Sequence, residues 1–124
     1  MTPGLTRHAG PHTFNHMVEH HAQLDLVFGS LSDATRRDIL RRIAKEELSV
    51  GEIASSYDMS FAAVSKHLAV LERARLVIKR REGKSQIVTF APAALSGATR
   101  HLERMRDIWE SRLDRLEKYL KEQP

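Results

Sequence analysis

Side chains that could contact a ligand stand together at the start of one predicted helix in the middle of the chain. The segment SFAAVSKH runs from Ser60 to His67, and Ser65 and His67 have the chemistry of a nucleophile and a base. Residues two apart on a helix do not face each other, so this pair cannot cooperate in catalysis. The chain also has no Gly-rich nucleophile elbow, phosphate-binding loop or constellation of paired carboxylates. The sequence therefore argues against an enzyme.

Histidines form the second group of residues with candidate chemistry. Near the N-terminus they recur every four residues, with a fifth beside the last: His8, His12, His16, His20 and His21. Gly10-Pro11 interrupts the helix that would stack them on one face, which leaves His16 and His20 as a pair. The predicted last helix offers three more ligand types without an obvious spacing: His101, Glu103 and Asp107. Two ligands are too few for zinc, so we expect no metal and no cofactor.

Basic side chains are concentrated in one short segment. Between residues 73 and 84, six basic residues stand against one acidic residue, a net of +5, whereas the whole chain carries +4. The six are Arg73, Arg75, Lys79, Arg80, Arg81 and Lys84. This local positive charge indicates an anionic partner.

The composition limits the elements that can position these groups. With 124 residues, of which 41% are hydrophobic and 29% charged, the chain is long enough for one domain with a modest core. No apolar run approaches the roughly 20 residues of a membrane span. The absence of cysteine excludes disulfides and thiolate metal sites. We expect a soluble, cytoplasmic protein without a membrane partner.

The first part of the chain is predicted to contain a tail and two helices. Residues 1–13, with two prolines and two glycines, are expected to be a flexible tail, and residues 14–121 one folded domain. Apolar spacing predicts a helix over residues 14–28, with Gly29 as its left-handed C-terminal residue. Ser32 is the expected N-cap of a second helix in SDATRRDILRRIA.

The next two helices form a helix-turn-helix pattern. Ser49 is expected to cap a helix over residues 50–57, and Ser60 a helix that runs to about Ala74. Two β-prone runs then flank the basic residues around Gly83, which predicts a hairpin with positive charge at its tip.

A long helix is predicted from Pro92 onward. It carries an apolar seam that Arg106 interrupts once. The seam consists of Leu102, Trp109, Leu113, Leu116 and Leu120. Such a seam normally packs against another helix.

In order and spacing, these segments resemble the ArsR/SmtB family of small bacterial winged-helix repressors, from about Leu24 to Leu120. The resemblance rests on LDLVFGSLSDATRRDIL, on VGEIASSYDMSFAAVSKHLAVLERARLV and on the basic hairpin. It implies a mainly α fold with a small β-hairpin, a winged helix-turn-helix, with MSFAAVSKHL as recognition helix and the hairpin as wing. It also implies a homodimer formed by the first and last helices. The long helix with Trp109 resembles the metal-independent branch of the family, whose members lack the known cysteine sites.

Three positions depart from the family pattern. The familiar Asp-Pro before Thr-Arg-Arg is Asp33-Ala34, and Ala-Gly-Leu before the wing is Ala74-Arg75-Leu76. Arg75 must therefore adopt a left-handed conformation, or the helix must end differently. Phe61 and Ala62 replace the Gln and Ser of many relatives, which reduces base reading by hydrogen bonds.

The resemblance and the charge together predict two sets of contact residues. The DNA set is Ser60, Phe61, Ala62, Ser65, Lys66 and His67 in the helix and Lys79, Arg80, Arg81 and Lys84 in the hairpin. The dimerisation set is Phe14, Met17, Leu102, Trp109, Leu113, Leu116 and Leu120. Ser65 and Lys66 can hydrogen-bond to DNA, and Phe61 and Ala62 can pack on thymine methyl groups. Burial in the core is the alternative for Phe61.

The sequence thus predicts a transcriptional regulator, a repressor that binds an inverted repeat in double-stranded DNA as a homodimer, with room for an unidentified small-molecule effector. Two other interpretations stay open. One is a metal-responsive sensor that uses the N-terminal histidines, and the other is a protein-interaction adaptor that has lost DNA binding. Lys66 and the basic hairpin argue against the adaptor.

Overall fold

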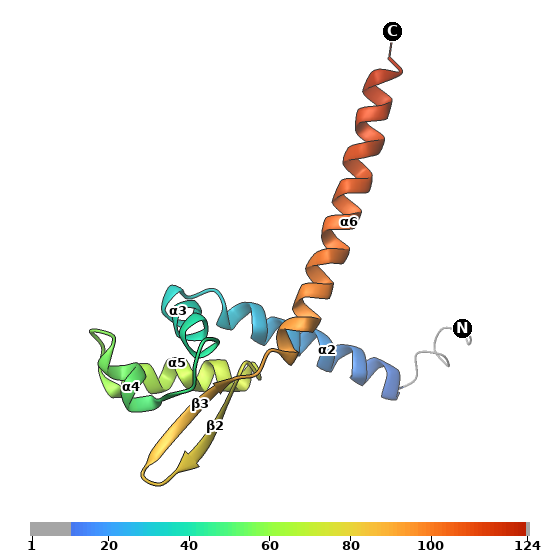
Figure 1. Ribbon diagram of the computed structural model, residues 1–124. Helices are drawn as coiled ribbons and strands as arrows, with labels where there is room; N and C mark the ends of the chain where they lie inside the picture. The colour runs from blue at the N-terminus through green and yellow to red at the C-terminus, as the bar shows by residue number, and fades with distance from the viewer. Residues whose placement is uncertain (1–10, 124) are drawn as a thin grey trace.

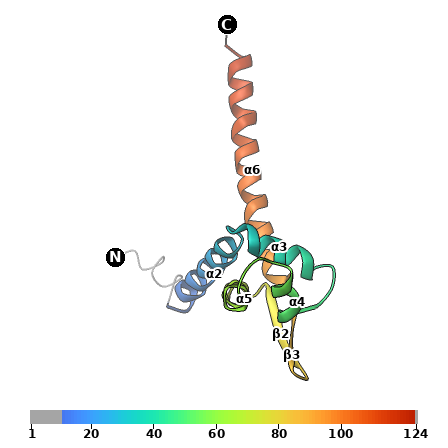
Figure 2. The same cartoon turned by 90° about the vertical axis from the view of Figure 1, so that its left-hand side faces the viewer.

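The computed structural model describes the backbone of residues 11–123 and the side chains of residues 21–123. The helices in chain order are α2 (Pro11–Ser30), α3 (Ala34–Ile43), α4 (Val50–Ser55), α5 (Phe61–Arg73) and α6 (Ala93–Lys121). The strands are β1 (Leu48–Ser49), β2 (Val77–Glu82) and β3 (Ser85–Phe90). The β2–β3 hairpin projects from one side of the helical body, and α6 rises from the other (Figures 1 and 2). This architecture confirms the predicted mainly α fold with a small hairpin.

Side-chain caps fix the starts of α4 and α5. The Ser49 hydroxyl accepts a hydrogen bond from the Glu52 backbone N–H at 3.0 Å, and the Glu52 carboxylate accepts one from the Ser49 N–H at 2.9 Å. This reciprocal pair satisfies two N–H groups that the first turn leaves open. The Ser60 hydroxyl accepts from the Ala63 N–H at 3.1 Å. Both predicted caps are confirmed. The helix after Ser49 ends at Ser55 and not at residue 57, and the Ser60 cap closes the turn that follows it.

The connection from α2 to α3 differs from the prediction in two respects. Asp33, not Ser32, is the N-cap of α3, because its carboxylate accepts from the Arg36 N–H at 3.0 Å. Gly29 lies within α2, and in the described part of the chain positive φ angles occur only at Arg75 and Gly83. The Ser32 hydroxyl donates to the Gly29 carbonyl at 2.7 Å, so that carbonyl has a partner without a left-handed turn.

The first helix begins earlier than its apolar spacing predicts. α2 starts at Pro11, so residues 11–13 are helical and do not belong to the expected tail. Proline is well suited to the first turn, where its missing N–H costs no hydrogen bond. Residues 1–10 lie outside the described chain, as do the side chains of Phe14 and Met17.

A three-stranded antiparallel sheet connects the helix-turn-helix to the hairpin. Its strand order is β1-β3-β2, and Leu48 of β1 pairs with Val88 of β3. Gly83 turns the hairpin at a φ of 61°, a conformation that glycine adopts without steric cost. The two-residue strand β1 carries no sequence signal of its own. Through its pairing with β3, this strand connects the segment before α4 to the wing.

Arg75 ends α5 in the left-handed conformation, with a φ of 62°. The Arg75 N–H donates to the Glu72 carbonyl at 2.9 Å, and the Leu76 N–H donates to the Leu71 carbonyl at 3.0 Å. This is the bonding of a helix that ordinarily ends in glycine. The first of the two alternatives for Arg75 is therefore the one that the structure adopts.

The core is built around α5. Val64, Leu68 and Leu71 are fully buried on one side of this helix, which packs against α2, α3, α4 and β2. The other buried apolar residues are Leu24, Val27, Ile39, Leu40, Ile43, Leu48, Val50, Ile53, Ala74, Leu76, Val77, Val88 and Ala98. Nearly every element contributes to this one core, so the orientation of α5 is set by the whole body.

The outer part of α6 leaves the body with its apolar side chains exposed. Ala98 is buried near the start of the helix, whereas Trp109 is 60% exposed. The exposed apolar residues are Leu102, Met105, Ile108, Trp109, Leu113, Leu116, Tyr119 and Leu120. Helical spacing places Met105 in the seam between Leu102 and Trp109, so the seam continues past the break predicted at Arg106. No helix within residues 11–123 combines the length and apolarity that crossing a membrane requires.

Replacing Arg75 by glycine should stabilise the fold. A left-handed conformation costs a non-glycine residue roughly 1 to 2 kcal/mol, and glycine adopts it freely. We expect Arg75→Gly to raise the free energy of unfolding by about 0.5 to 1 kcal/mol after the entropy of the unfolded chain is counted, measured by urea denaturation. The control is Arg73→Gly, within α5, which should destabilise by about 1 kcal/mol. Equal effects of the two variants would contradict the prediction.

Candidate nucleic-acid interface

One side of α5 is open to solvent and lies opposite the side that forms the core. Ala62, Lys66 and Ala69 are exposed, and Ser65 is partly buried beside them. These residues follow one another at helical spacing, so they share a face. The face presents small side chains and one cation, and a partner can approach its backbone closely. Ser60 is exposed as well, but its hydroxyl already caps the helix.

Phe61 stands exposed at the first turn of α5. Its residue is 60% accessible, so the alternative of burial in the core is wrong. Phe61 borders a groove between the start of α4, the start of α5 and the wing. The groove is lined by Ser49, Val50, Gly51, Phe61, Arg81, Lys84, Ser85 and Gln86. An aromatic ring and two cations therefore face the same open space.

His67 turns away from the open face of α5. Its side chain is 18% exposed, and Nδ1 lies 3.3 Å from Arg36 Nη1 and 3.8 Å from Asp33 Oδ2. Arg36 in turn donates to the carbonyl oxygens of Ser30 at 2.7 Å and Gly29 at 3.2 Å. His67 thus joins α5 to the connection between α2 and α3. The structure brings it together with these groups and not with Lys66.

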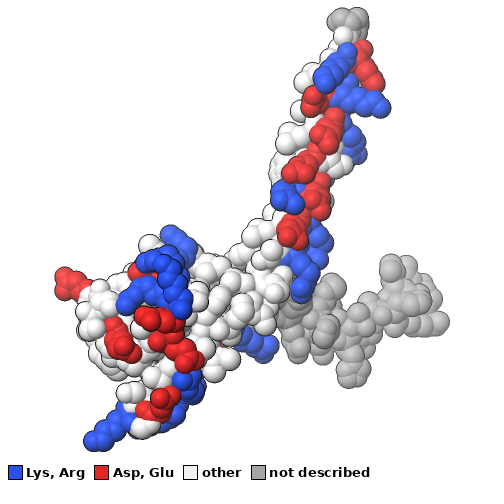
Figure 3. Space-filling model, in the orientation of Figure 1, with Lys and Arg blue, Asp and Glu red and all other residues white. Residues whose placement is uncertain are grey.

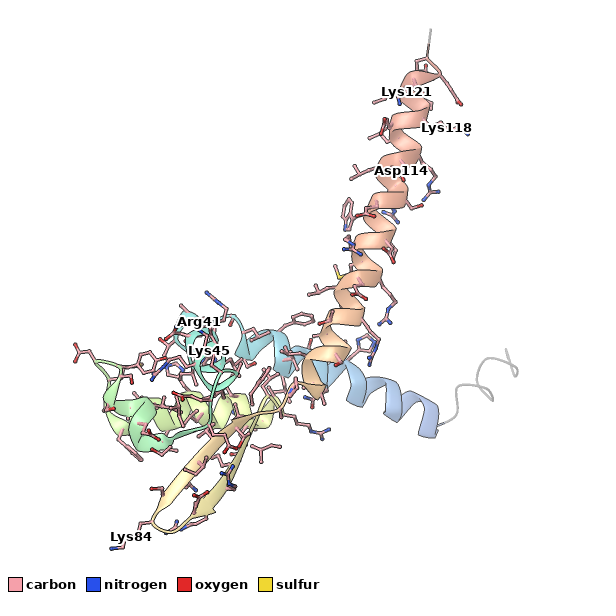
Figure 4. All side chains as sticks on the ribbon, viewed as in Figure 1. Arg41, Lys45, Lys84, Asp114, Lys118 and Lys121 are labelled. Atoms are coloured by element: carbon pink, nitrogen blue, oxygen red, sulfur yellow. The ribbon has the colours of Figure 1, made fainter. Side chains whose placement is uncertain are left out.

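The basic residues of the wing fall into two groups. Lys84 lies at the hairpin tip, far from Arg41 of α3 and from Lys45 just beyond that helix (Figure 4). Positive charge is visible at this tip (Figure 3). Arg81 faces the groove beside Phe61. Lys79 and Arg80, by contrast, have acidic partners within the chain. Lys79 Nζ lies 3.5 Å from the Glu72 carboxylate of α5.

Arg80 forms the strongest ion pair of the wing. Its guanidinium donates two hydrogen bonds to Glu47, at 2.6 and 3.0 Å, and a third to Glu82 at 3.1 Å. The Thr89 hydroxyl donates to Glu47 at 3.1 Å. The hydrogen bonds from Arg80, then from Thr89, lower the pKa of the Glu47 carboxyl, and those to Glu47 and Glu82 raise the pKa of Arg80.

A second polar cluster joins α3 to the turn after α4 and is not predicted from the sequence. The Tyr57 hydroxyl donates to Asp38 at 2.6 Å, and Arg42 lies over the Tyr57 ring at 5.5 Å. The hydrogen bonds from Tyr57 and then Arg41 lower the pKa of Asp38, while burial and then Asp38 raise the pKa of Tyr57. Asp38 and Tyr57 lie 19 positions apart, a distance to which no spacing rule applies.

Metal ligands do not gather among the described side chains. No three His, Cys, Asp or Glu residues in this part of the chain lie close enough to hold an ion. The side chains of His16 and His20 lie outside it. The ring of His101 packs near Phe28, with the ring centroids 6.2 Å apart, and so joins α6 to α2.

A helix-turn-helix whose second helix exposes one face beside a basic β-hairpin defines a winged helix-turn-helix DNA-binding domain. Residues 33–79 match the model of a family described as "Bacterial regulatory protein, arsR family". The chain belongs to this family of transcriptional regulators.

Known relatives agree with this assignment over most of their length. The HTH-type transcriptional regulator Rv2034 of Mycobacterium tuberculosis is 40% identical over 80 residues, which cover 64% of this chain and 75% of the relative. The transcriptional activator HlyU of Vibrio cholerae is 30% identical over 95 residues, covering 77% and 88%. An ArsR-like transcriptional regulator from Rhodococcus sp. RHA1 superimposes with a TM-score of 0.70 at 31% identity, covering 80% and 93%. The chain is accordingly a DNA-binding transcriptional regulator.

The Arg80–Glu47 pair should be visible in the titration of Glu47. We expect its pKa, followed by carboxyl NMR, to lie below the ordinary value of about 4.3 and to rise towards that value in Arg80→Ala. A lowered folded-state pKa means that the pair adds stability above the pKa of the unfolded chain and loses it as the pH falls through the folded-state pKa.

Glu52 provides the control for this titration. Its pKa is lowered by the Ser49 backbone N–H and then the Ser49 hydroxyl, so Arg80→Ala should leave it unchanged. An ordinary pKa for Glu47 in the unaltered protein would contradict the ion pair.

Proposed function

We propose that the protein is a homodimeric repressor that reads an inverted repeat with the exposed face of α5 and contacts phosphates with the wing. The observation that carries the proposal is the position of α5: the helix exposes Ala62 and Lys66, and its first residue, Phe61, borders the same groove as Arg81 and Lys84. A major groove admits one helix, and the first turns of the helix meet the base edges. A basic hairpin next to it reaches the sugar-phosphate backbone.

Side-chain chemistry assigns base contacts to the residues of α5 and phosphate contacts to those of the wing. Lys66 can donate to guanine or to a phosphate, and Ser65 can donate or accept. Phe61 and Ala62 have no hydrogen-bonding side chain, so their contribution to specificity is apolar contact with thymine methyl groups. Arg81 and Lys84 border the open groove, and their positive charge supplies the part of the binding that does not depend on sequence.

A second copy of the chain is the proposed partner of α6. Its exposed apolar seam, with Trp109 near the centre, continues from the buried Ala98. Figure 3 shows charged side chains running along one side of the arm and uncharged atoms along the opposite edge. Glu103, Glu110 and Glu117 line one edge at seven-residue spacing, and Arg112 lies on the other. A parallel pair sets Arg112 opposite a glutamate, whereas an antiparallel pair sets glutamates against each other. Parallel arms also bring both wings to the same end of the dimer (Figure 1).

Repression follows from occupancy of the DNA. A dimer on an inverted repeat in a promoter, its own or a neighbouring one, competes with polymerase for the same DNA without further parts. Action on DNA implies a cytoplasmic location and requires no chemical step from the protein's side chains.

Removal of Trp109 should break the dimer and with it specific binding. Trp109→Ala deletes the largest side chain of the seam, and we expect monomer or aggregate in sedimentation equilibrium and a parallel decrease in DNA affinity. Asp114→Ala, on the charged side of the same helix, is the matched control and should remain dimeric. A monomeric Trp109→Ala protein with unchanged DNA affinity would refute the dimer.

Two pairs of substitutions should separate reading from positioning. Ser65→Ala with Lys66→Ala should mainly weaken the preferred duplex, by about 1 to 3 kcal/mol for each good hydrogen bond to a base that is removed. Arg81→Ala with Lys84→Ala should weaken preferred and scrambled duplexes alike and lower the log-log salt slope by roughly one unit for each phosphate that is no longer bound. Fluorescence anisotropy at several salt concentrations measures both effects. An unchanged specificity ratio in the first pair, or an unchanged slope in the second, would overturn the assigned roles.

A further inference from the structure

The strand register divides the wing's basic residues between the two faces of the hairpin. Alternate residues of a strand point to opposite faces. Lys79 pairs with Glu72 of α5, and Arg81 borders the groove with Phe61, so their face is turned towards α5. Arg80 lies between them in β2 and is paired with Ile87 of β3. Its side chain therefore belongs to the face turned away from the recognition helix.

On that outer face, Arg80 joins three segments of the chain. Its guanidinium engages both Glu47 oxygens, at 2.6 and 3.0 Å, and lies 3.4 Å from the Thr89 hydroxyl. Glu47 immediately precedes β1, which leads into the Ser49 cap of α4. The contact therefore links the wing to the start of the helix-turn-helix.

The backbone alone attaches the wing to this segment only weakly. β1 offers two paired positions, Leu48 with Val88 and Ser49 with Ile87. The hairpin beyond Ile87 has no further β1 neighbour in the sheet. A bidentate arginine–carboxylate pair adds a directional contact next to this short ladder.

The charge around Arg80 also disfavours contact with a phosphate. Its one positive charge faces the carboxylates of Glu47 and Glu82, so the cluster carries a net charge of −1. An approaching phosphate meets repulsion there, and to bind Arg80 it would have to displace two carboxylates.

We propose that Arg80 is a positioning residue of the wing: with Glu47 it holds the hairpin against the start of α4, so that Arg81 and Lys84, on the other face and at the tip, reach the DNA. This inference rests on the proposed function, because it assumes that α5 and the wing bind DNA together. It differs from the prediction, made from the resemblance and the charge together, that Arg80 touches DNA.

The competing roles of Arg80 give opposite results when Glu47 is neutralised. If Arg80 bound phosphate, Glu47→Gln would free it and tighten binding. If Arg80 positions the wing, Glu47→Gln and Arg80→Ala break the same ion pair, and the double variant binds no more weakly than either single one. Arg80→Lys distinguishes the two roles again, since lysine keeps the charge but not the bidentate geometry. If Arg80 bound phosphate, this variant would keep most of the affinity; if Arg80 positions the wing, it should weaken binding as Arg80→Ala does.

The experiment uses the full chain and a duplex of about 30 base pairs selected from a random library with the unaltered protein, a length that holds two half-sites one helical turn apart. Anisotropy at several salt concentrations compares this duplex with a scrambled one. We expect Glu47→Gln, Arg80→Ala, Arg80→Lys and the double variant each to weaken binding by about three- to tenfold. The salt slope should not change, because the loosened wing still makes its phosphate contacts in the complex and the loss is the cost of ordering it there. Arg81→Ala should lower the slope by about one unit.

Glu46→Gln is the matched control, because it removes the same charge from the neighbouring exposed residue. It should not weaken binding. Tighter binding by Glu47→Gln, or a fall in slope in Arg80→Ala equal to that in Arg81→Ala, would overturn the inference while the proposed function stands. Failure of the unaltered protein to select any duplex would instead overturn the proposed function and the inference with it.

Discussion

In the proposed mode of binding, α5 has to serve the core and the DNA at the same time, and this constraint governs the rest of the structure. Val64, Leu68 and Leu71 fill the centre of the body from one side of α5, while Ala62 and Lys66 stay exposed on the other. A shift of the helix would expose buried apolar surface, and each Å² exposed would cost about 25 cal/mol of folding free energy. The packing that stabilises the domain therefore also fixes the presentation of the reading face.

Two further constraints act outside this core. The apolar seam of α6 is exposed in the described part of one chain, and in the proposed dimer a second copy covers it and supplies a second copy of α5. The wing extends beyond the core, and polar contacts replace packing there. The ion pair between Arg80 and Glu47 connects the wing to the start of α4, and α4 is itself packed into the core. The positions of the reading helix, the wing and the arm thus depend on one small set of buried residues.

Local rules predict those parts of the fold that depend on near neighbours. The caps at Ser49 and Ser60, the buried row of α5 and the turn at Gly83 each involve residues at most a few positions apart. Contacts between distant residues cannot be predicted in this way. Arg80 and Glu47 are 33 positions apart, and the face that Arg80 occupies depends on strand register, while His67 turns inward because Arg36 lies across from it. The intramolecular partners of Arg80 and His67 could therefore not be predicted from the sequence.

The central claim, that the exposed face of α5 enters the major groove while the wing lies beside it, can be tested directly because the chain has no cysteine. A DNA-cleaving iron chelate can be attached to a single cysteine at Ala69→Cys in α5, at Lys84→Cys in the wing tip, or at Lys118→Cys in the arm as control. The account predicts two symmetric cleavage clusters from Ala69→Cys, one in each half-site, flanking clusters from Lys84→Cys and none from Lys118→Cys. Cleavage from the arm, or none from α5, would contradict it.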